Sequence, residues 1–166
     1  MSQPLSSLAA IVRLIRPGDS VDALRCRVLG EFMATGEETQ RVLRAHIARA
    51  GLTVEGFQAL AMLAAAKDNR ATPGVLAAEI GITRASFSHV LARLEISQLI
   101  HRRRDVENRR MVQVDLTPLG RQALDLAMGA CAEGVLQIAR ALDEASLREL
   151  MKSCGKVQKE VEELAS

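Results

Sequence analysis

Residues 72–97, TPGVLAAEIGITRASFSHVLARLEIS, contain two helix-start signals around one helix-stop signal. Thr72 is a side-chain cap followed by Pro73 at the first helical position, and Gly81 supplies a left-handed stop about eight residues later. Thr83 is a second cap, followed by apolar residues at helical spacing: Phe87, Val90, Leu91 and Leu94. Two helices separated by a short turn that contains glycine are typical of a helix-turn-helix.

The second of these helices has a polar face opposite its apolar stripe. If the stripe faces inward, five side chains that can donate hydrogen bonds face outward: Arg84, Ser86, Ser88, His89 and Arg93. A helix fits the major groove of DNA, where arginine reads guanine and serine or histidine reaches base edges or phosphates. An ordinary solvated helix face would show the same pattern.

Residues 99–116, LIHRRRDVENRRMVQVDL, follow directly and have a different period. Val112, Val114 and Leu116 alternate with polar residues, which predicts a half-buried strand and, with the preceding segment, a β-hairpin. Such a hairpin after a helix-turn-helix is a wing, and arginines near its tip can enter a narrow minor groove. The candidates are Arg102, Arg104, Arg109 and Arg110. A solvated charge run is the alternative.

The distribution of charge supports contact with a polyanion. The chain of 166 residues has a net charge of +2, but residues 84–110 contain seven arginines and three acidic residues, a local charge of +4. The absence of Trp and Tyr excludes aromatic stacking platforms for single-stranded nucleic acid. A hydrophobic content of 48% is typical of a globular chain, and the length predicts one compact domain.

Amphipathic helices are predicted on both sides of this central region. Residues 5–15 and 20–50 form the first two, with Gly36 as a place where the second helix kinks or splits, and a third spans residues 53–66. Residues 117–142 and 143–164 have apolar stripes with alternating spacings of three and four, which favour packing against another chain. Packing within the chain is the alternative. The predicted layout is N-terminal dimerisation helices, a winged helix-turn-helix and C-terminal dimerisation helices, at 1–50, 51–117 and 118–166.

Other site types are not indicated. Three widely spaced cysteines suggest neither a disulfide framework nor a metal site, and we expect a reducing compartment and a cytoplasmic protein. The longest uncharged run is too short to span a bilayer, so no membrane partner is expected. We find no phosphate-binding glycine loop, nucleophile elbow or metal motif, so we predict no enzyme, cofactor or metal.

From Gly51 to Gly120 the sequence resembles the MarR family of winged-helix transcriptional regulators. The resemblance rests on five ordered pieces: GLT at 51–53, LAAEIGIT at 76–83, LARLE at 91–95, LIHR at 99–102, and NRR at 108–110 leading to VDLTPLG at 114–120. It implies a fold that is mainly α with a small β-wing. By position, Arg84, Ser86, Ser88 and His89 lie on the recognition helix, and Arg109 and Arg110 lie on the wing.

The resemblance also implies a function. It predicts a sequence-specific regulator that binds double-stranded DNA: a ligand-responsive repressor acting as a homodimer on a pseudo-palindromic operator, with a small-molecule effector. The alternative is a DNA-binding accessory or protein-interaction dimer without ligand response.

Candidate sensing residues follow from the same layout. Phe32, His46 and Phe57 are candidates for a ligand pocket, because His46 lies on the inner stripe of its helix and changes charge near neutral pH. Some relatives sense peroxide through an N-terminal cysteine activated by tyrosines, which makes Cys26 the redox candidate, although this chain has no tyrosine.

Three positions depart from the family pattern. Asn108 stands where an acidic residue usually orients a wing arginine, and Gln98 replaces the glycine common before the Leu-Ile pair. A residue with a Cβ must therefore make the turn at Gln98. Gly56 stands where a glutamine is common, without a functional explanation.

Overall fold

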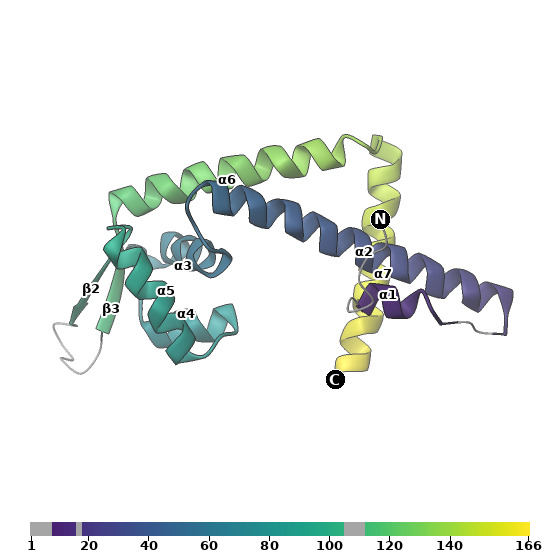
Figure 1. Cartoon of the computed structure of the whole chain (residues 1–166), viewed down its shortest axis with the longest axis horizontal. Coiled ribbons are helices and arrows are strands. Elements are labelled where there is room, and N and C mark those ends of the chain that lie inside the picture. The colour runs from purple at the N-terminus through teal and green to yellow at the C-terminus, as the bar shows by residue number, and fades with distance from the viewer. Residues whose placement is uncertain (1–7, 16–17, 105–111) are drawn as a thin grey trace.

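The computed structural model describes residues 8–15, 18–104 and 112–166. Most of this part of the chain is helical (Figure 1). The α-helices are α1 (Leu8–Val12), α2 (Ser20–Arg49), α3 (Val54–Ala65), α4 (Pro73–Ile80), α5 (Arg84–Ile96), α6 (Pro118–Ala139) and α7 (Glu144–Ala165). A 3₁₀ turn, η1 (Lys67–Asn69), follows α3.

Three short strands form one antiparallel sheet: β1 (Arg70–Ala71), β2 (Ile100–Arg104) and β3 (Val112–Leu116). Their order is β1-β3-β2, and β2 pairs with β3 from Ile100 opposite Leu116 to Arg104 opposite Val112. The predicted hairpin is therefore confirmed. Sequence analysis missed β1, because two residues are too few to show an alternating pattern.

The helix-turn-helix forms where the capping signals predict it. The Thr72 side chain accepts a hydrogen bond from the backbone N–H of Val75 at 3.4 Å, and Thr83 accepts one from Ser86 at 3.2 Å. Gly81 ends α4 with a φ of 76°, a left-handed conformation that glycine adopts without strain. These local signals fix both ends of the turn between α4 and α5.

The hydrophobic core lies among α3, α4, α5, the sheet and the first half of α6. Its largest fully buried side chains are Leu60, Leu63, Leu76, Phe87, Leu91, Ile100, Val114 and Leu124. We call residues 54–116 the winged region. It lies at one end of the long α2 and α6 helices, which contact each other and diverge with distance from it (Figure 1).

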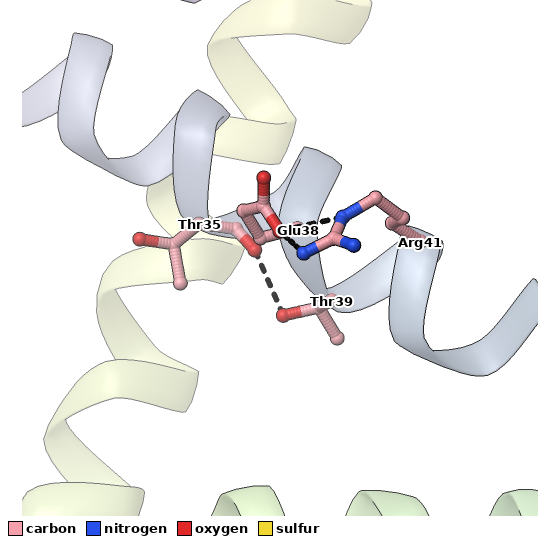
Figure 2. Close-up of polar contacts among 4 residues, drawn as sticks. All are labelled: Thr35, Glu38, Thr39 and Arg41. Atoms are coloured by element: carbon pink, nitrogen blue, oxygen red, sulfur yellow. Dashed lines mark hydrogen bonds and ion pairs between the residues drawn. The ribbon is translucent and has the colours of Figure 1, made fainter. Parts of the chain in front are cut away.

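Helix α2 continues through Gly36, so the predicted split there is wrong. Figure 2 shows one side-chain bond that spans that glycine, from Thr39 Oγ1 to the Thr35 carbonyl at 2.8 Å, and a second that follows it, from Arg41 to Glu38. A glycine inside a helix costs about 1 kcal/mol, which is too little to end a helix of 30 residues.

The far end of the molecule is much less buried. We call α1, residues 20–34 of α2, and α7 the helical arm. Helix α7 crosses α2 there (Figure 1), and none of its residues is buried. Within the described segments, no helix combines the length and the apolar character needed to cross a membrane.

Candidate nucleic-acid interface

The face of α5 that points away from the core carries the five predicted DNA-contacting residues. Arg84, Ser86, Ser88, His89 and Arg93 are all exposed, whereas Phe87, Leu91 and Leu94 retain 5% or less of their exposure. The helical period therefore separates the two sets as predicted. The five polar residues share the exposed side of the helix with Ala85 and with Ile96, which is 82% exposed.

The two serines present opposite hydrogen-bonding character. The Thr83 hydroxyl donates to Ser86 Oγ at 2.9 Å, so the Ser86 hydroxyl proton points to no acceptor within the described chain. The Ser88 hydroxyl donates to the Arg84 carbonyl at 2.9 Å, which leaves its oxygen as an acceptor. In this conformation Ser86 suits an acceptor such as guanine N7, and Ser88 suits an amino group.

The arginines divide into those held by acids and those without an acidic partner. Arg102 is bonded to Glu95, and Asp115 pairs with both Arg103 and Arg70, at 2.6 Å and 3.2 Å. Arg84, Arg93 and Arg104 make no ion pair with any residue that the structure describes. Their uncompensated charge gives this side of the winged region a positive surface.

Strand β2 sorts its side chains between two faces. Successive residues of a strand point to opposite sides, so Arg102, which contacts Glu95 of α5, and Arg104 share one face. His101 and Arg103 share the other, where Asp115 lies. Arg104 is therefore the β2 arginine on the same side as α5 that has no acidic partner among the described residues.

The guanidinium of Arg84 lies beside the beginning of α4. A Cβ added to Gly74, in the first turn of α4, would lie 3.5 Å from a terminal nitrogen of Arg84. The N-terminal end of a helix carries partial positive charge, which adds to that of the guanidinium. The arrangement favours a phosphate group at this place.

The ionisation of Glu95 follows from its position. The hydrogen bonds from Arg102 hold the pKa of this carboxyl below its usual value of 4.5. Glu95 is therefore a carboxylate at neutral pH, and its charge is directed to Arg102.

Two predicted wing residues, Arg109 and Arg110, lie outside the described residues, as does Asn108. Their contribution to DNA binding stays a prediction.

The three predicted ligand-pocket residues occupy separate places. Phe32 lies in an apolar groove between α2 and α7, whereas the His46 ring lies against Gly134 of α6 and Phe57 is half-buried against the core. Phe32 and His46 are 14 positions apart on one helix, about 21 Å at 1.5 Å per residue. The structure does not bring them together into one cavity.

The α2–α7 groove has a volume of about 650 Å³. Its lining is almost entirely apolar and includes Leu24, Val28, Phe32, Leu150, Cys154, Val157 and Val161. Sequence analysis did not single out Cys154. The redox candidate Cys26 is half-buried on α2 and, like Cys131 and Cys154, is a free thiol. No cluster of potential metal ligands occurs among the described residues.

The architecture defines a winged helix-turn-helix protein. A sequence model of the MarR family matches residues 50–111, the helix-turn-helix and the wing. Over these residues the chain is similar to the MarR family, as its motifs indicate.

Individual proteins are similar to this chain as well. The chain is 26% identical over 106 residues to the HTH-type transcriptional repressor YetL of Bacillus subtilis strain 168, and the match covers 64% of this chain. The chain spans 64% of the length of that curated relative. The crystal structure of YusO from Bacillus subtilis superposes with a TM-score of 0.73 at 18% identity, covering 85% of this chain and 99% of YusO.

A third comparison includes nucleic acid. A mutant of MepR from Staphylococcus aureus, bound to an oligodeoxyribonucleotide, superposes with a TM-score of 0.61 at 20% identity. The match covers 78% of this chain and 94% of that one. At this level of identity the two structures establish the shared fold.

Proposed function

We propose that this protein is a transcription regulator that binds double-stranded DNA through α5 and the wing. The observation that carries the proposal is the exposed face of α5, where five hydrogen-bonding side chains lie together and Arg84 and Arg93 have no acidic partner among the described residues. Such a face has the width and chemistry to read the major groove. A regulator of this kind fits the predicted cytoplasmic location and the prediction that the chain is not an enzyme.

The comparisons support the same proposal. The curated relative is a transcriptional repressor, and one structure of the same fold holds an oligodeoxyribonucleotide. We therefore propose repression as the mode of regulation. Within the interface, Arg84, Ser86, Ser88, His89 and Arg93 contact the major groove, and Arg104 contacts the backbone beside it. Arg109 and Arg110 are proposed to enter the minor groove.

We further propose that the active form is a homodimer on a pseudo-palindromic site. Helix α7 has no buried residue, and it shares with α2 a groove lined by apolar side chains. A second copy of the same chain would cover these surfaces by a two-fold interface. Two winged regions would then contact half-sites about 10 base pairs apart, centre to centre. Effector binding, implied by the family, stays a prediction.

The test is selection of random DNA duplexes by the purified protein at physiological salt, with the molar mass of the complex measured by light scattering. We expect an enriched palindrome, bound at least about 10³-fold more tightly than random DNA by two chains. Weak, salt-sensitive binding without enrichment would contradict the regulator and favour the accessory or protein-interaction dimer.

Paired variants locate the interface. Arg84→Ala is expected to weaken binding to all DNA sequences about equally and to lower the salt slope by about one, because its guanidinium lies where a phosphate group is favoured. Arg41→Ala removes an equally charged and exposed side chain on α2, paired there with Glu38, and is expected to leave operator binding unchanged. Equal effects of the two substitutions would show that only overall charge matters.

A further inference from the structure

The carboxylate of Glu95, near the end of α5, holds Arg102 of β2 at three points. Glu95 Oε1 accepts the backbone N–H of Arg102 at 3.2 Å, and Oε2 accepts Nε at 2.7 Å together with a terminal guanidinium nitrogen. About a third of each side chain is exposed. Because one carboxylate bonds both the main chain and the side chain, it fixes the path of the strand as well as the arginine.

The hydrogen bond from the Arg102 backbone N–H to Glu95 pairs a donor that the order of the strands leaves without a partner. Strand β2 lies at an edge of the sheet, so its N–H groups on the side away from β3 have no partner strand in the part of the chain that the structure describes. Glu95 supplies the acceptor for one of them. This bond ties the edge of the wing sheet to the helix that carries the predicted base-contacting residues.

The turn between α5 and β2 is closed as well. Gln98 donates its N–H to the Glu95 carbonyl and Leu99 donates its N–H to the Leu94 carbonyl, both at 2.9 Å, and Gln98 has a φ of 59°. This pattern is a Schellman motif, with glutamine where glycine is usual. The Thr117 hydroxyl, at the start of α6, donates to the carbonyls of Gln98 and Leu99. The turn fixes where β2 begins, and Glu95 fixes the direction in which it continues.

We propose that Glu95 is a positioning residue of the DNA-binding surface: through Arg102 it sets the angle between α5 and the wing, so that both engage one duplex. The proposal rests on the proposed function. It gives Arg102 a different role from the predicted DNA contact, because its guanidinium is bonded to Glu95, whereas Arg104, two residues along the same face, has no partner among the described residues.

The proposal makes a specific claim about which contacts change. Loss of the Glu95–Arg102 bonds leaves α5 and its side chains intact but frees the direction of β2. Contacts made by the wing are therefore lost, while the base preference of α5 is retained. If Arg102 were itself a phosphate contact, removal of Glu95 would release a cation and tighten binding.

The experiment uses the full-length protein and the operator obtained by selection. Operator affinity, hydroxyl-radical footprints and melting temperature are measured for Glu95→Gln, Arg102→Ala and the double variant. Glu38→Gln, which removes a similar arginine-paired carboxylate on α2, is the control. We expect Glu95→Gln to bind about tenfold more weakly and to lose minor-groove protection at the wing, with the same preferred bases at positions facing α5.

The double variant separates positioning from direct contact. If Arg102 acts only through Glu95, the double variant binds as weakly as either single variant, and the dependence of affinity on salt is the same in all three, because each loses the same wing contacts. Additive losses, with a salt slope about one lower in Arg102→Ala than in Glu95→Gln, would overturn the proposal. Equal or tighter binding by Glu95→Gln at an unchanged melting temperature would overturn it as well.

Two further outcomes are distinguished. If the wild-type protein selects no operator, the proposed function fails and this inference fails with it; if it selects one and the Glu95 variants bind it normally, only the inference fails. Glu95→Gln keeps an acceptor for the Arg102 N–H. Glu95→Gln therefore tests the positioning role of Glu95 even if a larger truncation of this side chain would unfold the wing.

Discussion

The winged region and the helical arm contain apolar stripes of similar regularity. The stripes of the winged region are buried within the chain, whereas that of α7 in the arm stays largely exposed. In the winged region Phe87 and Val114 are fully buried by other parts of the same chain. In the arm, Leu150 and Val161 lie on an equally regular stripe of α7 and remain 45% and 58% exposed. The period of a stripe thus indicates that a face will be buried, whereas the neighbouring elements determine whether the same chain can bury it.

The largest loss of stability is expected from a substitution where the winged region joins α6. A Cβ added to Gly120 would lie 2.0 Å from the Leu99 carbonyl oxygen and 2.9 Å from Leu116 Cδ1. Because backbone lies in the way, Gly120→Ala is expected to reduce the free energy of unfolding by about 3 kcal/mol or more. Denaturant unfolding measures the loss.

Gly129, on the same helix, is the matched control, because a Cβ there meets nothing within 4 Å. Gly129→Ala is expected to stabilise the protein by about 0.5–1 kcal/mol through helix propensity. Equal stability changes in the two variants would show that the junction does not depend on the close contact of Gly120 with Leu99 and Leu116.

The second effect concerns the arm. Val157 lines the α2–α7 groove, and Val157→Asp is expected to weaken self-association by about 2 kcal/mol, roughly 30-fold, because the proposed dimer interface would have to bury the new charge. Sedimentation across a range of concentrations measures it. Gln158→Asp, at the adjacent exposed position, should leave the dimer intact; a monomer in the wild type would refute the dimer proposal directly.

The third effect concerns the turn of the winged region. Gln98 adopts a left-handed conformation that costs a residue with a Cβ about 1 kcal/mol, so Gln98→Gly is expected to raise the melting temperature. Ser97, one residue earlier, has a φ of −79°, and Ser97→Gly is expected to lower it. A rise in both variants would mean that flexibility, and not the sign of φ, governs this turn.

The smallest effect is a dependence on pH. Since Arg102 lowers the pKa of Glu95 in the folded protein, the stability due to this pair is fully present above the ordinary pKa of 4.5 and is lost as the pH falls through the lower folded value. Glu95→Gln should flatten this part of the curve of unfolding free energy against pH. If the curve is the same in Glu95→Gln, the loss of stability in acid comes from another carboxyl group. One example is Asp143, whose pKa is lowered by the backbone N–H of Ser146.

Sequence reasoning located the elements whose signals are local. The ends of the helix-turn-helix are fixed by the capping side chains of Thr72 and Thr83 and by the positive φ angle of Gly81. The helical period of α5 separates its buried face from its exposed face. The need for a special turn at Gln98 was also visible, because the position has a Cβ where glycine is usual.

Features that depend on distant partners were not predictable in this way. Arg102 was indistinguishable from Arg104 in the sequence, because its partner Glu95 reaches it only after the chain has reversed at Gln98. A carboxylate seven residues before a strand arginine, with a left-handed turn between them, is the signal that could have identified the pair. Phe32 and His46 share a stripe but not a cavity. A stripe shows that two side chains lie on the same face of a helix, but it does not show that they lie close together.

The unbroken course of α2 has a mechanical consequence. A helix of 30 residues is about 45 Å long, and it connects the apolar groove at one end with the winged region at the other. A tilt of about 5° at the groove end displaces the opposite end by about 4 Å, slightly more than the 3.4 Å spacing of successive base pairs. If the winged region moves with this end of α2 as one body, α5 shifts by about one base-pair step along a bound duplex.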